Sequence, residues 1–569
     1  MNRMGQIASI ALMLALSCLI IGWANSYPVS LRAADDSNLA HISWFFWIGL
    51  FSAYPALFFV GINSKPGVRA FCLIIFMLLF SAHKLLYLQT GSDTEVFIGL
   101  LDRFNDTGLL DSDDKTYYQW PIMTIWGFLL QQLFSATSAE AYTLFWVVLI
   151  IGYGISGYII FRKEESDLPY DFLGCTLYLM ALFWFWDWQV SAYNWSLILV
   201  FSILSLLKIN GWPFRFFIMT AFLLLTFSHG MLSVWILGIV PTTMALEWLV
   251  TKKRPGWSTL VVTFVIIQIT VLLFHALRLT RHIVLTFSNY LTSILEQELS
   301  SSTLNAYAAG AATPPANFFD MVTKWLAWGN LGLLFLLLGI GFIVPIWRRD
   351  FNLRDWSIAG VGVGHFALGN VLPLLGIRAF NIMFILPSRG IAAAMEVQRL
   401  RVPVMLLFLI ALLLFPVNQI RTQLNNPQYN TVQNLDAARF LSDIVERRYE
   451  LGTATTDADA KVRSTQTSVL ADQAQLYYIT SALPQETIRT INPRLSLPES
   501  VKDAEFTVIN AQLEHELWKR LWPDKQTILQ ESETVRFDRI YDSGTNVIFQ
   551  QQNSNSIMDV VSKAEETGL

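Results

Sequence analysis

The chain has 569 residues, of which 54% are hydrophobic and only 14% are charged, whereas a soluble chain carries about 25% charged residues. A net charge of −4 and the lack of a dense basic block exclude a nucleic-acid partner, which needs a positive surface for its phosphates. Long apolar runs fill residues 1–420, while residues 421–569 have the composition of a soluble domain. The cysteines lie within apolar runs, which indicates buried thiols rather than disulfides or a metal site; they are Cys18, Cys72 and Cys175. The sequence therefore predicts a polytopic α-helical membrane protein with a C-terminal soluble domain.

Apolar segments along residues 1–420 predict about thirteen transmembrane helices, each of which needs roughly 20 residues to cross the hydrocarbon. They lie near 5–23, 43–62, 68–90, 140–161, 170–187, 192–208, 214–228, 231–250, 258–278, 325–347, 356–375, 379–396 and 402–420. The first segment has the alternative of a cleaved signal peptide. We expect a retained anchor, because the apolar stretch is long and the sequence at 23–26 is a poor cleavage site.

Basic residues accumulate in every second loop, as expected of cytoplasmic loops. They are Arg3; Lys65 and Arg69; Arg162 and Lys163; Lys208 and Arg215; Lys252, Lys253 and Arg254; Arg348, Arg349 and Arg354; Arg399 and Arg401. The alternation requires that the short apolar segment 121–136 does not cross, and the aromatic residues before it suit an interfacial segment. The prediction is a multi-pass plasma-membrane protein with a cytoplasmic N-terminus and an extracytoplasmic C-terminal domain.

The first long outer loop, residues 91–139, is acidic and contains an amphipathic pattern. Its apolar residues recur at helical spacing and predict a helix on the membrane surface directly after Asp93; they are Val96, Phe97, Leu100, Leu101 and Phe104. Asp93 is a candidate general base at the mouth of the bundle, or a first-turn residue that the helix dipole favours. Glu95 is a second catalytic candidate, but Ser92 and Glu95 also have the spacing of a capping box.

Several features of this loop together resemble the first outer loop of GT-C glycosyltransferases. These are the acid after a span, the surface helix, Gly108-Leu109-Leu110, Tyr117-Tyr118-Gln119-Trp120-Pro121, and Ser138-Ala139-Glu140. The segment 537–544 is similar to the closing hairpin of outer domains in this superfamily, which includes protein mannosyltransferases and aminoarabinose transferases. The resemblance implies a polyprenyl-phosphate-linked sugar donor, with Asp93 as catalytic base or metal ligand. We count Tyr118 among the substrate-binding candidates.

Two basic residues at outer span ends are candidates for binding a lipid phosphate. Lys84 lies nine positions before Asp93 (93 − 84 = 9) and could bind phosphate or extend to the interface as an anchor. Arg378 has a guanidinium that suits a bidentate phosphate clamp, with an interfacial anchor as the alternative.

Three further outer residues have a functional and a plainer interpretation. Asp187 could join Asp93 in holding a divalent cation such as Mg or Mn, or be a hydrated loop carboxylate. His229 could contact substrate or metal, or be a turn residue. Arg281 begins an amphipathic stretch in the outer loop 279–324, which is either a mobile cover over the site or a surface loop.

The outer domain, residues 421–569, has a mixed α/β pattern. We expect strands at 468–471, 487–491 and 506–509, a hairpin around 542–544, and helices over 435–449, 474–482 and 511–521. This order suggests one small sheet covered by helices. No phosphate loop, nucleophile elbow or zinc motif occurs in its sequence, so we expect it to cover the cavity or hold an acceptor.

These predictions lead to a membrane glycosyltransferase that moves a sugar from a polyprenyl-phosphate donor to a glycan, lipid or protein acceptor at the outer face, with inversion. The sequence does not identify a cofactor, and a divalent cation is the one candidate. Two alternatives stand beside the enzyme: a non-catalytic envelope scaffold of the same architecture, and a transporter or flippase of lipid-linked saccharides. A flippase is expected to have internal repeats and ionisable residues near the bilayer midplane. In this sequence the ionisable residues lie at the outer span ends instead.

Overall fold

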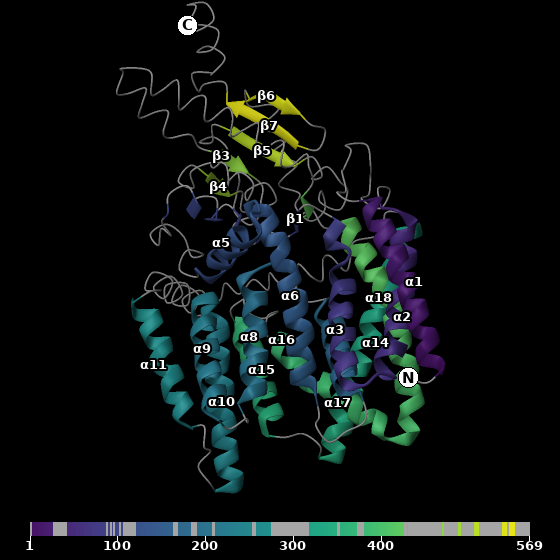
Figure 1. Ribbon diagram of the computed structural model, residues 1–569, viewed down its shortest axis with the longest axis vertical. Coiled ribbons are helices and arrows are strands. Elements are labelled where there is room, and N and C mark those ends of the chain that lie inside the picture. Colours follow the sequence, from purple (N-terminus) through teal and green to yellow (C-terminus); the bar gives the residue numbers. More distant parts are fainter. Residues whose placement is uncertain are drawn as a thin grey trace, which may run out of the picture.

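The computed structural model describes a bundle of helices and the strands of a sheet beyond it (Figure 1). The described residues are 3–26, 42–86, 89–90, 94, 97–98, 100–101, 104–105, 108, 121–162, 169–183, 190–207, 211–252, 258–274, 318–349, 353–371, 380–425, 429–430, 469–471, 488–490, 506–510, 537–542 and 546–551.

Every predicted span coincides with a described helix, and the span near 379–396 coincides with two. The helices are α1 (Arg3–Ala24), α2 (Trp44–Ile62), α3 (Pro66–Ser81), α5 (Ile122–Phe134), α6 (Ser138–Phe161), α7 (Tyr170–Leu182), α8 (Ala192–Leu206), α9 (Trp212–Ser228), α10 (Gly230–Thr251), α11 (Ser258–Phe274), α14 (Phe318–Arg348), α15 (Leu353–Val371), α16 (Phe380–Met383), α17 (Ile385–Glu396) and α18 (Gln398–Asn425). Among the described residues, six helices are long and apolar enough to cross a membrane, within α1, α2, α6, α10, α14 and α18. The protein is therefore a multi-pass membrane protein, and the number of crossings stays a prediction.

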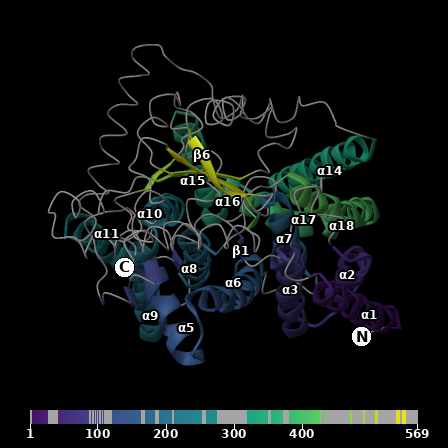
Figure 2. The ribbon, with the colours of Figure 1, turned by 90° about the horizontal axis from the view of Figure 1, so that it is seen from above.

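The two ends of the bundle differ. We call the end that holds the C-terminal ends of α3 and α18 the sheet end, because the sheet lies beyond it, and the opposite end the far end (Figure 1). Seen from the sheet end, α1 and α2 lie at one edge of the bundle and α9 and α11 at the other (Figure 2). Helix α5 lies at the sheet end (Figure 1) and has 13 residues, as α7 does. That segment 121–136 does not cross the membrane stays a prediction.

Helices α1 and α2 pack closely because small residues line their contact. A methyl group at Gly49 of α2 would collide with the backbone of Leu19 in α1. Leu12 and Ala15 of α1 are buried on the same side, whereas Leu14 on the opposite face is 64% exposed. An exposed apolar face of this kind suits contact with lipid chains.

The apolar face predicted after Asp93 packs on protein. Phe97 is fully buried with its ring 6.2 Å from that of Tyr142 in α6, and Phe104 meets Phe128 of α5 edge-on at 5.3 Å. The described positions of this segment are helical. Its described aromatic side chains, Phe97 and Phe104, thus pack on α6 and α5.

The described C-terminal strands form one five-stranded sheet in the order β4-β3-β5-β7-β6. The strands are β3 (Val469–Ala471), β4 (Ile488–Thr490), β5 (Phe506–Asn510), β6 (Phe537–Asp542) and β7 (Asn546–Gln551). Strands β4, β3 and β5 are parallel, while β7 is antiparallel to both β5 and β6. All five coincide with predicted strands. The predicted helices of this domain lie outside the described residues, so its α/β class stays a prediction.

A separate two-stranded ladder joins the segment that follows α3 to the segment that follows α18. Strand β1 (Gln89–Thr90) pairs antiparallel with β2 (Tyr429–Asn430). This pairing brings together two segments that are far apart in the sequence.

Candidate functional site

Two of the predicted site residues, Lys84 and His229, lie among the described residues. The other predictions lie outside them; these are Asp93, Glu95, Tyr118, Asp187, Arg281 and Arg378. Lys84 and His229 belong to helix ends on the sheet side of the bundle, each within its own cluster of buried polar residues. We call these the Gln419 cluster, of Tyr54, His83, Lys84 and Gln419, and the Asn381 cluster, of Tyr178, Tyr193, His229, Trp235, His365 and Asn381.

Lys84 begins a short 3-10 helix, Lys84–Leu86, just beyond α3, and its side chain is only 4% exposed. The predicted span to residue 90 therefore ends earlier, at Ser81, where the chain turns. The amide N–H of Ala82 donates to the Leu79 carbonyl at 3.2 Å, which tightens the last turn. Because the helix stops here, the last carbonyl groups of α3 need partners from elsewhere.

Gln419 of α18 supplies those partners. Its side-chain Nε2 donates to the carbonyl oxygens of Leu79 at 2.9 Å and Phe80 at 3.2 Å. The hydroxyl of Tyr54 in α2 donates to Gln419 Oε1 at 3.2 Å. Gln419 is fully buried and Tyr54 is 1% exposed. The carboxamide of Gln419 therefore joins α2, α3 and α18 at the place where the chain turns toward Lys84.

His83 extends the same network. Its Nδ1 lies 3.2 Å from Gln419 Nε2, which can only donate, so Nδ1 accepts and the ring proton is assigned to Nε2. His83 lies beyond the end of α3. Its burial, and secondly the neighbouring Lys84 ammonium, lower its pKa well below the ordinary value. A neutral imidazole beside Lys84 leaves the ammonium as the positive charge of this cluster.

The Asn381 cluster is centred on α16. Asn381 Nδ2 donates to the hydroxyl of Tyr193 in α8 at 2.7 Å. The hydroxyl of Tyr178 in α7 donates to the backbone carbonyl of Asn381 at 2.8 Å. The ring of His229, at the junction of α9 and α10, meets Tyr193 edge-on at 5.2 Å. Asn381 is 1% exposed, and none of the described residues donates a hydrogen bond to its Oδ1. This cluster therefore offers a buried amide oxygen that can accept a hydrogen bond from a hydroxyl group.

An imidazole and an indole complete this cluster. Trp235 Nε1 of α10 donates to His365 Nδ1 of α15 at 3.2 Å, and the Trp235 ring also meets Tyr193 edge-on at 6.1 Å. His365 therefore accepts at Nδ1, as His83 does. The cluster ties α8, α10, α15 and α16 together around His229.

A metal site finds no support among the described residues, which contain no group of three or more His, Cys, Asp or Glu that could hold an ion. The predicted carboxylate ligands, Asp93 and Asp187, lie outside the described residues. A divalent cation therefore stays a prediction.

Sequence reasoning missed most of both clusters. Gln419 is a carboxamide within the last apolar run, and Asn381 opens another run, so each was detectable as a polar residue in an apolar segment. Their partners were not detectable, because Tyr54 and Gln419 are 365 residues apart.

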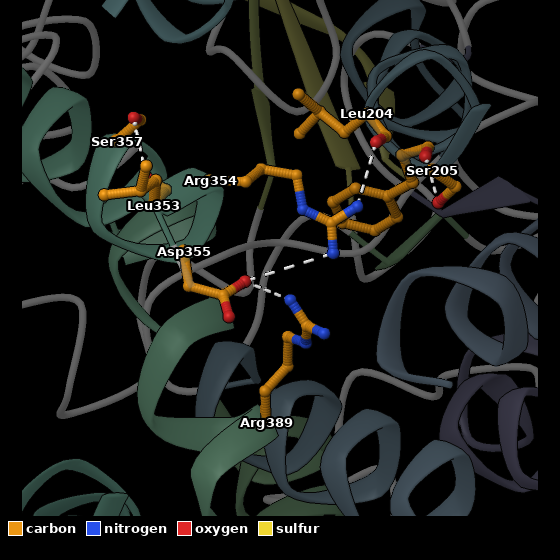
Figure 3. A network of polar contacts seen from close by, with 8 residues as sticks. Leu204, Ser205, Leu353, Arg354, Asp355, Ser357 and Arg389 are labelled. Atoms are coloured by element: carbon orange, nitrogen blue, oxygen red, sulfur yellow. Dashed lines mark hydrogen bonds and ion pairs between the residues drawn. The ribbon is translucent and has the colours of Figure 1, made fainter. Parts of the chain in front are cut away.

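Three of the basic residues used to predict orientation, Arg69, Arg348 and Arg354, form ion pairs at the far end of the bundle. Arg69 of α3 lies 3.1 Å from Asp171 of α7, from Nε to Oδ1, and Arg348 of α14 lies 2.8 Å from Glu396 of α17. In a third group, Arg354 and Arg389 converge on Asp355 (Figure 3). Each of these three arginines thus has an acidic partner within the bundle, and Arg354 shares its partner with Arg389.

The bundle, its apolar helices and its buried polar clusters define a multi-pass α-helical membrane protein. No protein-family model matches its sequence, and no curated protein matches it. It is similar to the crystal structure of ArnT from Cupriavidus metallidurans bound to undecaprenyl phosphate, with 12% sequence identity and a TM-score of 0.45 over 86% of this chain and 99% of that one. For the apo state of the same ArnT the identity is 12% and the TM-score 0.44, over 85% of this chain and 98% of that one.

Proposed function

We propose that this protein is a membrane glycosyltransferase of the GT-C type, which transfers a sugar from a polyprenyl-phosphate-linked donor to an acceptor hydroxyl at the outer face. The observation that carries the proposal is the buried ammonium of Lys84, 4% exposed at the end of α3. A cation removed from water attracts a phosphate strongly, since solvent screens it less. Asp93 follows nine residues later (93 − 84 = 9) and supplies the carboxylate that acts as the general base.

The reaction requires one bond to form and one to break at the anomeric carbon. The acceptor oxygen attacks this carbon from the face opposite the phosphate, so the configuration inverts. The bond to the phosphate oxygen breaks, and its electron pair leaves with the polyprenyl phosphate, whose charge Lys84 and Arg378 stabilise. Asp93 takes the acceptor proton as general base.

Other predicted residues have supporting roles in the proposal. His229 and the buried amide of Asn381 bind sugar hydroxyls, and Tyr118 and Arg281 contact the substrate. Glu95 assists Asp93. A divalent cation held by Asp93 and Asp187 is the alternative to general-base catalysis, and loss of transfer on treatment with a chelator distinguishes the two.

The test is sugar transfer by the purified protein in lipid nanodiscs, with a polyprenyl-phosphate sugar as donor. Asp93→Asn should lower the transfer rate by about a hundredfold or more, the usual contribution of a general base. Asp106→Asn, in the same acidic loop, is the matched control and should transfer normally. A correctly folded Asp93→Asn protein with wild-type transfer would overturn the proposal.

A second measurement separates the enzyme from a scaffold. Lipids extracted from the purified wild-type protein should contain a polyprenyl phosphate or its glycoside, detected by mass spectrometry. Lys84→Met should reduce the amount recovered, because the phosphate loses its ammonium. A scaffold predicts that no lipid-linked sugar copurifies and that Asp93 can be replaced without effect.

A further inference from the structure

We infer that Gln419 is the positioning residue for Lys84, and that Tyr54 orients Gln419 for this role. The inference rests on the proposed function, in which Lys84 holds the donor phosphate. Gln419 itself lies in α18, the last helix among the described residues, and contacts the turn that precedes Lys84.

The orientation of the Gln419 carboxamide is forced by its surroundings. Nε2 faces the carbonyl oxygens of Leu79 and Phe80 and the acceptor Nδ1 of His83, all within 3.2 Å. An amide rotated by 180° would point its oxygen at the two carbonyl oxygens and lose both of these hydrogen bonds. The Tyr54 hydroxyl adds a donor on the other side, at Oε1. Tyr54 thereby removes the remaining freedom of the carboxamide.

The same contacts decide where α3 ends. In a continuing α-helix, the Leu79 and Phe80 carbonyls would accept the backbone N–H groups of His83 and Lys84. Gln419 Nε2 occupies these carbonyls instead, which allows the chain to turn at Ala82 and begin a 3-10 helix at Lys84. One further turn of α-helix would rotate Lys84 to another face of α3. Gln419 thus competes with the backbone and fixes the direction of the ammonium.

A second contact holds the same segment from the other side of Lys84. Strand β1 starts five residues after Lys84 (89 − 84 = 5), and its partner β2 starts ten residues after Gln419 (429 − 419 = 10). The segment that carries Lys84 therefore contacts α18 just before the lysine, through Gln419, and pairs with the strand beyond α18 just after it. This repeated pairing is what positions Lys84, rather than its rotamer alone.

The structural arm of the test is hydrogen–deuterium exchange of the full-length protein in nanodiscs. Gln419→Met keeps the side-chain length but cannot donate, and Gln419→Glu keeps the shape but presents a second acceptor to the carbonyls. Both should increase exchange in peptides covering 79–90. Asn418→Leu is the matched control, because the neighbouring Asn418 side chain donates to Asn330 of α14 instead. It should leave exchange at 79–90 unchanged.

The functional arm measures binding of undecaprenyl phosphate and the donor kinetics. Gln419→Met and Lys84→Met should weaken binding by about tenfold or more, equivalent to about 1.4 kcal/mol. For Gln419→Met the donor KM should rise and kcat should fall, because Lys84 both binds the phosphate and stabilises the charge that develops on it, and Tyr54→Phe should show the same changes to a smaller extent. A general loss of folding would instead lower the amount of active protein and leave the donor KM unchanged.

Two results would overturn the inference. One is unchanged exchange at 79–90 in Gln419→Met, or an equal increase in Asn418→Leu. The other is undiminished lipid binding by Gln419→Met when Lys84→Met binds weakly. A wild-type protein that binds no undecaprenyl phosphate would overturn the proposed function, and the exchange measurement would still decide whether Gln419 holds the turn.

Discussion

Replacement of Asp355 should destabilise the far end of the bundle, because this carboxylate is shared by two arginines (Figure 3). Arg389 donates to Asp355 Oδ1, and Arg354 Nη2 lies 4.0 Å from the same oxygen. Their side chains are 15% and 12% exposed, and that of Asp355 is 5% exposed. Arg354 Nη1 also donates to the Leu204 carbonyl at 3.1 Å, so this arginine keeps one partner when the carboxylate is removed.

The magnitude follows from the burial of the group. Removing one partner of a buried ion pair costs about 3–5 kcal/mol, because an uncompensated charge remains. We expect Asp355→Leu to lie near the lower end, at about 3 kcal/mol, since Arg354 retains Leu204 and both arginines reach some solvent. The double replacement Asp355→Leu with Arg389→Met should recover at least about 1 kcal/mol of this loss, because one of the stranded charges is also removed.

The assay is reversible unfolding in mixed micelles by titration with SDS, followed by tryptophan fluorescence. Glu396→Gln is the control on the neighbouring pair, whose side chains are more exposed, at 31% for Arg348 and 24% for Glu396. It should cost about 1 kcal/mol or less. The reasoning is wrong if Asp355→Leu costs no more than this control, or if the double variant is less stable than Asp355→Leu.

Two further predictions concern helix packing and capping. Gly49→Val should lower the free energy of unfolding by about 2 kcal/mol, because it forces α1 away from α2. Gly67→Val should cost much less, because no atom lies within 4 Å of a Cβ added there. Equal losses of stability in the SDS titration would contradict the close contact of α1 and α2. Thr137→Ala should cost about 1 kcal/mol, the usual effect of losing an N-cap, because Thr137 and Glu140 form a reciprocal capping box at α6; wild-type stability in the same titration would count against the cap.

The positions of the helices could be predicted from the sequence because the signal is local. The apolar run 140–161 predicts α6 without information from any other segment, and the alternating pattern at 506–509 predicts β5 in the same way. The loop helix after Asp93 was also visible, since Phe97 and Phe104 repeat at helical spacing. The packing of that helix on α5 and α6 was not, because composition does not distinguish a lipid neighbour from an apolar protein neighbour.

The far-end arginines show why the polar contacts could not be predicted. The sequence indicated loop charges that set the orientation at Arg69, Arg348 and Arg354. It did not indicate their acidic partners, which are Asp171, Glu396 and Asp355. Asp171 follows Arg69 by 102 residues (171 − 69 = 102), so only the fold brings the two together. Of the candidate site, the sequence predicted Lys84 and His229 but neither Gln419 nor Asn381, for the same reason.

The hydrogen bonds of Gln419 also bear on the order in which this protein is made. They join residues separated by 340 and 339 positions, from α3 to α18. A nascent chain that has not yet released α18 from the ribosome leaves the Leu79 and Phe80 carbonyls without these partners. The surroundings of Lys84 are therefore completed only after α18 has been made, although Lys84 itself is made early.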